Sequence, residues 1–264
     1  MTASKKSTTD RKTIAVLGAE LNRGWGAEFM AGVLDSAKAH DTNVVYFAGG
    51  KPVAIAAPQY GGRSYGLYDL IKPGQFDGIL LAADIGRGSS PEDIKNFCRV
   101  FAPTPVASFA VQAEGVSSFI ADNIGGMRAV IRHLIEDHGY KRIAFVRGLK
   151  GQLESDQRFD AYKDELKLHN IRFDERLVVE GDYSPQSGRA AVRILLDERG
   201  IRIQAIAASN DRMAFGIMEA LQQRGIQVPD NMALTGFDDI SESQSMGVPL
   251  TTVHQPFHEA GQLA

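Results

Sequence analysis

The sequence predicts an α/β protein made of two doubly wound parallel-sheet lobes. Short apolar runs rich in Val, Ile and Phe recur at the spacing of a strand plus a crossover helix, about 30 residues. They are apolar on both faces, as in parallel sheets covered by helices on both sides, and they are too numerous for one tidy sheet. The predicted strands are Thr13–Leu17, Val44–Phe47, Gly78–Leu81, Val106–Phe109, Ile143–Val146, Leu177–Val179, Ala205–Ala208 and Met232–Leu234.

The segments between these strands have the periodicity of amphipathic helices. Two helices are predicted with one apolar face each. The face of the first comprises Met127, Val130, Ile131, Leu134 and Ile135, and that of the second comprises Ala214, Ile217, Met218 and Leu221. The second of these helices is expected to end at Gly225, because Pro229 follows soon after.

Composition narrows the class of protein. The 264 residues are 44% hydrophobic and 23% charged, close to the globular average, and 29 Lys and Arg against 32 Asp and Glu give a net charge of −3. Chains that hold nucleic acid usually carry a basic excess, so we expect no direct nucleic-acid contact. The polar N-terminus lacks a secretory signal, and no long apolar run predicts a membrane segment. These features, together with a single cysteine, Cys98, favour the cytoplasm.

Polar and aromatic residues follow most of the predicted strands. Ligands of doubly wound sheets bind at the carboxyl ends of the strands, so these residues are candidates for a binding site. Together they offer donors, acceptors and aromatic faces to a polar ligand. The predicted ligand-binding residues are Trp25, Asp84, Glu154, Ser155, Arg158, Tyr183, Asn210 and Asp238.

Each candidate also has a structural interpretation. Tyr183 could cap a surface loop, Arg158 could be a solvated helix residue, and Trp25 could anchor the first helix to the core. Asp238 and Asp239 could be paired catalytic carboxylates, but adjacent residues of an extended strand point to opposite sides. The expectation is one ligand-facing and one structural aspartate.

The sequence gives little support for catalysis, a metal or a cofactor. His254 and His258 have a helical metal-binding spacing, but Pro256 lies between them and no third ligand is evident nearby. There is no nucleotide-binding glycine loop after the first strand, no GxSxG elbow, and no base paired with Cys98. We therefore predict a binding protein that is not an enzyme and needs no metal or cofactor.

Four stretches of the chain resemble the lac-repressor-like (LacI/GalR) family in order and spacing. They are Asp122–Gly126 with His133–Ile135 and His138–Phe145; Gly181–Gly188; Ser209–Gly216; and Val228–Asp230 with Thr235–Asp239 and Pro249–Pro256. The resemblance implies that Arg158 reaches the ligand, that Tyr183 stacks on its ring, and that Asn210 and Asp238 hydrogen-bond to it. Trp25, Glu154 and Ser155 would be neighbours in the pocket.

The resemblance also implies the organisation and the partners. The resemblance implies the periplasmic-binding-protein-like type I fold, with an N-terminal lobe over 12–139 plus 253–264, a C-terminal lobe over 140–252, and a ligand cleft between the lobes. The polar residues 1–11 before them are predicted to form a flexible tail. The effector would be a sugar-like or nucleobase-like small molecule that acts through lobe closure, and the protein would form a homodimer.

Both ends of the chain depart from the family pattern. Only the 11-residue tail and Lys12 precede the first strand, where the family's repressors have a helix-turn-helix, and the chain stops at Ala264 inside an expected helix. We therefore expect a fragment. Glu136–Gly139 and Phe145–Gly148 are similar to N-terminal sensor modules of bacterial signalling proteins, whose output domain would be a histidine kinase or a cyclase. A LacI-type transcriptional regulator core without its helix-turn-helix and an extracytoplasmic solute-binding protein are the alternatives.

Overall fold

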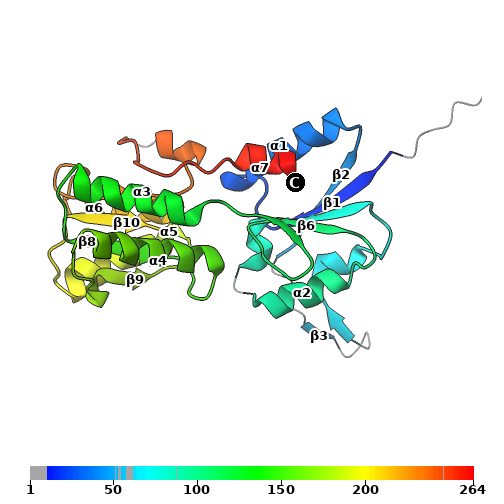
Figure 1. The fold of residues 1–264 in the computed structure, drawn as a ribbon, viewed down its shortest axis with the longest axis horizontal. Helices are drawn as coiled ribbons and strands as arrows, with labels where there is room; N and C mark the ends of the chain where they lie inside the picture. The colour runs from blue at the N-terminus through cyan, green and yellow to red at the C-terminus, as the bar shows by residue number, and fades with distance from the viewer. Residues whose placement is uncertain (1–10, 51, 53–54, 58–61, 88, 246) are drawn as a thin grey trace, which may run out of the picture. The chain divides into compact units, whose positions relative to one another are not determined.

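The computed structural model describes residues 11–50, 52, 55–57, 62–87, 89–245 and 247–264, with the strands at 55–57 and 62–64 described by their backbone alone. The chain forms two compact units (Figure 1). Unit 1 comprises Met1–Ile120 and Pro256–Ala264, and unit 2 comprises Ala121–Gln255. The predicted α/β class with two parallel-sheet lobes is confirmed.

Unit 1 is built on a five-stranded parallel sheet with the strand order β2-β1-β5-β6-β7. A short antiparallel pair, β3 and β4, accompanies it. The strands are β1 (Thr13–Gly18), β2 (Asn43–Ala48), β3 (Ile55–Ala57), β4 (Gly62–Ser64), β5 (Gly78–Leu81), β6 (Val106–Phe109) and β7 (Ser117–Phe119).

The helices of unit 1 are α1 (Trp25–Ala39), α2 (Pro91–Arg99) and α7 (Phe257–Leu263), with the 3-10 turns η2 (Gly66–Leu70) and η3 (Ala83–Gly86). Helices α1 and α7 lie side by side although more than 200 residues separate them (Figure 1). Helix α2 begins with a capping box, because the Ser90 hydroxyl accepts from the Asp93 amide and the Asp93 carboxylate accepts from the Ser90 amide.

Unit 2 is built on a four-stranded parallel sheet with the order β11-β10-β8-β9. The strands are β8 (Ile143–Arg147), β9 (Val178–Glu180), β10 (Ala205–Ala208) and β11 (Ala233–Thr235). The helices are α3 (Asn123–Glu136), α4 (Leu153–Leu168), α5 (Pro185–Val192) and α6 (Asp211–Gln222). Helix α5 continues into the π-helical segment η5 (Arg193–Glu198). Two 3-10 turns complete the unit, η4 (Glu175–Leu177) and η6 (Ser241–Gln244).

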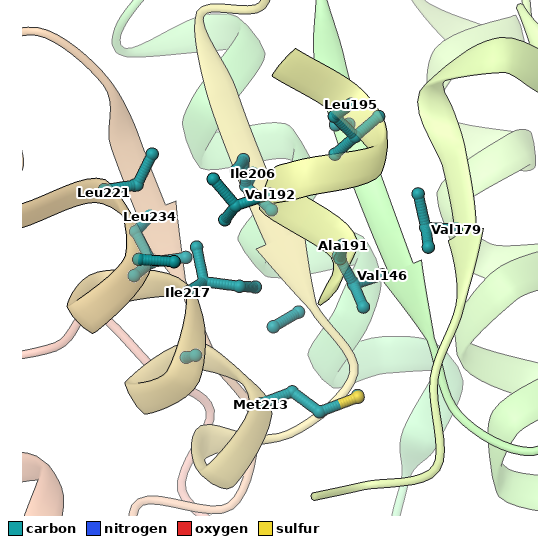
Figure 2. Close-up of a cluster of buried hydrophobic side chains, with 14 of the residues drawn as sticks. Val146, Val179, Ala191, Val192, Leu195, Ile206, Met213, Ile217, Leu221 and Leu234 are labelled. Carbon is teal, nitrogen blue, oxygen red and sulfur yellow. The ribbon is translucent and has the colours of Figure 1, made fainter. Parts of the chain in front are cut away.

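Apolar side chains bury both faces of the unit 2 sheet. Helices α3 and α4 cover one face, where Met127 and Ile131 join Tyr162 and Phe145 in a buried cluster. Helices α5 and α6 cover the other face, shown in Figure 2, where Ile217 and its neighbours meet the strands. Each fully buried side chain of this size contributes about 1.5–3 kcal/mol to folding. Because both faces are buried, the strands are continuously apolar.

A buried carboxylate joins α3 to α4. Glu165 is fully buried, and its Oε1 lies 2.9 Å from Arg132 Nη2 and 4.0 Å from Arg128 Nε. His169 extends this network, since its Nε2 lies 2.9 Å from Glu136 Oε1 and its Nδ1 lies 2.9 Å from the Glu165 carbonyl oxygen. These contacts hold α3 against α4, so both helices belong to unit 2.

The units therefore divide the chain differently from the predicted lobes. The boundary expected after residue 139 falls after Ile120, and the return expected at 253 falls at Pro256. Helical periodicity placed α3 correctly along the chain but could not show that α3 packs on α4 and β10. The predicted tail at 1–11 lies outside the described residues except for Arg11, whose Nε lies 3.1 Å from Asp41 Oδ1. Every described helix is too short or too polar to serve as a membrane span.

Candidate functional site

Six of the eight predicted ligand-binding residues lie in unit 2. Tyr183, Asn210 and Asp238 follow β9, β10 and β11, whereas Glu154, Ser155 and Arg158 lie in the first turns of α4, which follows β8. Because the four strands are parallel, the segments that follow them leave the same edge of the sheet. We call these six residues with Asn123, Ser209, Phe237 and Gln255 the polar cluster.

Arg158 is the centre of the polar cluster and is 3% exposed. Its Nε donates to Asn123 Oδ1 at 2.9 Å and its Nη1 donates to the Ser209 carbonyl oxygen at 2.6 Å. The guanidinium carbon lies 3.8 Å from the centre of the Phe237 ring, a cation–π contact. These contacts rule out the interpretation of Arg158 as a solvated residue and fix its guanidinium in one orientation.

Asp238 is buried beside Arg158. Its Oδ1 accepts from Gln255 Nε2 at 2.6 Å and lies 3.9 Å from Arg158 Nη1. Burial raises the pKa of the Asp238 carboxyl to about 8; Arg158 opposes this shift and the nearby carboxylate of Asp211 adds to it. Asp238 therefore holds a proton over much of the neutral range and can donate as well as accept.

Tyr183 and Asn210 meet at the ends of β9 and β10. The Asn210 side chain caps α6 by accepting from the Met213 amide at 3.0 Å, and its Nδ2 lies 3.4 Å from the Tyr183 carbonyl oxygen. Tyr183 has φ +67° and is 9% exposed. Its ring occupies the space where a side chain on Gly148 would stand. A tyrosine in the left-handed region is strained, and such residues gather at functional sites.

Several buried hydroxyls of the polar cluster are unpaired. Among the described residues, Ser155 Oγ, Ser209 Oγ and the Tyr183 hydroxyl have no hydrogen-bond partner of normal geometry. Ser155 and Tyr183 are near enough to interact, and burial is the main cause that raises the pKa of Tyr183, so this hydroxyl stays protonated. Glu154 is half-buried and near enough to raise the pKa values of Tyr183 and Asp238. These hydroxyls therefore have hydrogen-bonding capacity that polar groups of a ligand could use.

Sequence reasoning left four members of the polar cluster out of the predicted site. Phe237 carries no polar group, and Asn123, Ser209 and Gln255 lie in the family stretches without a predicted role. Their contacts to Asp238 and Arg158 are the signal, and these contacts exist only in the folded chain.

The aspartates that follow Asn210 and Asp238 in the sequence pair with other parts of unit 2. Asp211 is fully buried and accepts from Ser243 Oγ at 2.6 Å, from Thr252 Oγ1 at 2.5 Å and from the Ile240 amide at 3.1 Å. Asp239 Oδ2 pairs instead with His254 Nδ1 at 3.0 Å. Asp238 is thus buried beside Arg158, whereas its neighbour Asp239 is half-buried and pairs with His254, and the ligand-facing role of Asp238 stays a prediction.

Asp84 belongs to unit 1, where it holds the loop that follows β1. Its Oδ2 accepts from the amides of Ala19 and Glu20, the latter at 3.0 Å. Its Oδ1 is buried without a partner among the described residues, and burial raises the pKa of the carboxyl. This geometry gives Asp84 a capping role, and its contact with a ligand stays a prediction.

Trp25 also belongs to unit 1 and begins α1. Its ring centre lies 6.0 Å from that of Phe257, 6.1 Å from Phe109 and 6.4 Å from Phe29. The aromatic contacts agree with the interpretation of Trp25 as an anchor of the first helix. Its ring is only half-buried, and a role in ligand binding stays a prediction.

His254 and His258, the two histidines with a helical metal-binding spacing, each pair with a carboxylate of their own unit. His254 pairs with Asp239 in unit 2, and His258 pairs with Asp35 in unit 1 at 3.0 Å. In the part of the chain that the structure describes, no group of three or more His, Cys, Asp or Glu side chains could hold a metal ion. Burial raises the pKa of the Cys98 thiol to about 11, which makes it a poor nucleophile.

The chemistry of the polar cluster is that of recognition. It offers a fixed guanidinium, a protonated carboxyl, a carboxamide, hydroxyls and an aromatic ring in a buried setting. Such groups bind ligands that carry several hydroxyls or a carboxylate on an apolar ring.

Comparison with known proteins gives one family and a consistent set of relatives. A family model described as a periplasmic binding protein-like domain matches residues 131–264. The ribose operon repressor of Escherichia coli (strain K12) is 36% identical over 190 residues, which are 71% of this chain and 56% of the repressor. Catabolite control protein A of Priestia megaterium is 29% identical over 266 residues, covering 99% of this chain and 74% of that protein.

A solved structure of the transcriptional regulator CelR in complex with cellobiose has a TM-score of 0.79 and 26% identity, and the match covers 96% of this chain and 76% of CelR. The chain spans 56% of the length of the ribose operon repressors that it matches. These relatives are transcriptional regulators rather than enzymes or signalling kinases. The comparisons therefore favour the regulator-core alternative over the signalling sensor module.

Proposed function

Because the chain belongs to the periplasmic-binding-protein-like domain family, as a ligand-binding domain of LacI/GalR type, we propose that it is the effector-binding core of a transcriptional regulator. The effector is a sugar-like small molecule, and the residues that hold it in unit 2 are those of the polar cluster. A nucleobase-like effector is the alternative that the experiment below tests.

The observation that carries this proposal is the set of buried polar groups with unused hydrogen-bonding capacity. Ser155 Oγ and the Tyr183 hydroxyl lie near enough to interact with each other beside Asp238, and neither has a hydrogen-bond partner of normal geometry among the described residues. A sugar supplies several hydroxyls that both donate and accept, and its carbon face can lie on a tyrosine ring. The names of the relatives point the same way, since one represses a ribose operon and another was solved with cellobiose.

The remaining parts of the proposal concern the whole protein. We place it in the cytoplasm as a homodimer whose DNA-binding segment lies outside this sequence, because its relatives are longer transcriptional regulators. Sedimentation analysis of the chain tests the dimer, and a single species with the mass of one chain at micromolar concentration contradicts it.

Thermal-shift screening followed by calorimetry tests the effector class. The panel contains ribose, cellobiose, other pentoses and hexoses, polyols and purines. A compound at 100 times its Kd stabilises the protein by about 2.7 kcal/mol, which is easily detected. We expect at least one sugar to raise the Tm, and a response confined to purines would replace the sugar by a nucleobase.

Two adjacent aspartates provide a matched pair of variants. Asp238→Ala and Tyr183→Ala should each weaken binding at least tenfold, about 1.4 kcal/mol, whereas Asp239→Ala should leave the affinity unchanged. Circular dichroism confirms that each variant is folded. A screen without any response, or equal losses in the Asp238 and Asp239 variants, would overturn the site.

A further inference from the structure

Two histidine rings converge at the C-terminal end of α3, away from the polar cluster. His133 lies in the last turn of α3 and His138 lies just beyond the helix end. Their Nε2 atoms are 3.3 Å apart, the ring centres are 4.7 Å apart, and the ring planes are nearly perpendicular at 87°. Both rings are accessible to solvent, because His138 is exposed and the side chain of His133 is 40% exposed.

The tautomer of His133 is fixed by a carboxylate. Asp137 Oδ2 lies 2.6 Å from His133 Nδ1 and can only accept when ionised, so the proton of the neutral ring is on Nδ1. The Nε2 atom of His133 therefore carries its lone pair toward His138. A carboxylate on the far nitrogen of an imidazole is the usual support of a metal-bound histidine, where it orients the ring and raises its basicity.

The turn after α3 fixes His138. Gly139 has φ +69°, its amide donates to the Ile135 carbonyl oxygen at 2.9 Å, and the Tyr140 amide donates to the Leu134 carbonyl oxygen at 3.1 Å. The Tyr140 ring stacks on His138, with centres 5.4 Å apart and planes inclined by 14°. This glycine turn lets residues five apart face each other, and the C-terminal end of a helix favours a positive charge.

We propose that His133 and His138 chelate one divalent transition-metal ion, Zn²⁺, Ni²⁺ or Cu²⁺, through their Nε2 atoms, with water completing the coordination. Two imidazole nitrogens on a tetrahedral zinc ion, each 2.0–2.1 Å from the metal, are about 3.4 Å apart, close to the separation observed here. Asp137 acts through His133 and is not a ligand, so this two-histidine site is smaller than the clusters of three side chains that the described residues lack.

Imidazole pairs select transition metals over the hard ions Mg²⁺ and Ca²⁺, which prefer oxygen ligands. The ion would join the end of α3 to the segment that leads into β8. It therefore offers the regulator a second input that is separate from the effector.

Calorimetric titration of the full chain with ZnCl₂, NiCl₂ or CuCl₂ tests the proposal, with MgCl₂ as the chemical control. We expect one saturable site for at least one transition metal and none for Mg²⁺. The double variant His133→Gln with His138→Gln should weaken that site at least tenfold. The matched variant His254→Gln with His258→Gln removes the same number of histidines and should retain it.

A positioning role for Asp137 gives a second readout. Asp137→Asn should weaken metal binding by about tenfold or more, because it loses the carboxylate that orients His133. Asp160→Asn, at an exposed carboxylate paired with Lys163, should leave binding unchanged. Absence of saturable binding, retention of full affinity without His133 and His138, or an equal loss in the His254 and His258 variant would overturn the proposal.

Discussion

Nη1 of Arg158 lies 3.9 Å from Oδ1 of Asp238, and both residues are more than nine-tenths buried. At this distance the guanidinium lowers the pKa of the carboxyl without cancelling the effect of burial. Arg158 instead directs its hydrogen bonds to Asn123 and the Ser209 carbonyl oxygen. The pair therefore combines a fixed cation with a protonated acid. The free energy of unfolding should depend on pH through Asp238 and on the hydrogen bonds of Arg158.

The first prediction concerns Asp238→Asn and pH. The pKa of Asp238 is about 8 in the folded protein and about 4 in an unfolded chain, so the folded state holds the extra proton between these values. The stability that this proton gives to the folded state is fully present below about pH 4. It is lost as the pH rises to about 8, and the free energy of unfolding falls by at most about 1.4 kcal/mol per pH unit.

Asp238→Asn removes this contribution, because a carboxamide does not titrate. Urea unfolding of both proteins at pH 5, 6.5 and 8 measures the difference. We expect the variant to gain stability relative to the parent protein as the pH rises. A difference that stays constant with pH would show that Asp238 does not titrate in this range.

The second prediction concerns Arg158→Lys. A lysine has no planar fork, so it cannot reach both Asn123 Oδ1 and the Ser209 carbonyl oxygen. Leaving one buried acceptor unpaired costs about 1–3 kcal/mol in the free energy of unfolding. The control is Arg176→Lys, at an exposed residue that pairs with Asp174, where the loss should be below about 1 kcal/mol. Equal losses at the two positions would contradict the role given to Arg158.

Much of the fold could be predicted from the sequence because the central strands of both sheets are buried on both faces. The predicted strands Gly78–Leu81, Val106–Phe109 and Ala205–Ala208 coincide with β5, β6 and β10. Met127, Val130, Ile131 and Leu134 of the predicted helix face are buried. The β3–β4 hairpin and β7 were missed, because three-residue strands give too little periodicity.

Only the part of the candidate site that directly follows the strands could be predicted from the sequence. Parallel strands bring the segments after β9, β10 and β11 to one edge of the sheet, so Tyr183, Asn210 and Asp238 could be expected there. The anchoring of Trp25 by Phe257 could not be expected, because the two lie 232 positions apart and no local pattern pairs them.

The third prediction concerns His169 and the α3–α4 network. The hydrogen bond to Glu136 is the largest cause that raises the pKa of His169, followed by that to the Glu165 carbonyl oxygen. Its contribution to stability is fully present below about pH 6.5 and is lost as the pH rises through the higher folded value. His169→Gln should therefore destabilise the protein more at pH 5.5 than at pH 8.5 in urea unfolding. His40→Gln, at an exposed histidine, is the control. A loss of unfolding free energy in His169→Gln that does not change with pH would contradict the prediction.

The fourth prediction concerns Gly148→Ala. A Cβ at Gly148 would lie 2.2 Å from the Tyr183 ring, which is buried and must leave its position. We expect a loss of about 1–3 kcal/mol in stability and a loss of effector affinity comparable to that of Tyr183→Ala. Gly151→Asn is the control in the same loop, since Gly151 has φ +80° with open space around it and asparagine tolerates that conformation. If Gly148→Ala keeps full affinity for the effector, the Tyr183 ring does not contribute to effector binding.

The last prediction concerns the close crossing of α1 and α7 in unit 1. A Cβ at Gly32 would lie 1.9 Å from the His258 carbonyl oxygen, and one at Gly261 would lie 2.1 Å from the Phe29 carbonyl oxygen. Both clashes are with backbone, so Gly32→Ala or Gly261→Ala must push the helices apart. This should cost about 1–3 kcal/mol and weaken the hydrogen bond between Asp35 and His258.

The single tryptophan reports on this crossing directly. Trp25 contacts Phe257 at the start of α7, so separation of the helices should expose its indole to water and shift its fluorescence to longer wavelength. Gly50→Ala is the control, because Gly50 is exposed with nothing within 4 Å of the position of a Cβ. If Gly261→Ala keeps the emission and the unfolding midpoint of the parent protein while Gly50→Ala does the same, then α7 does not need the glycine contact to stay on α1.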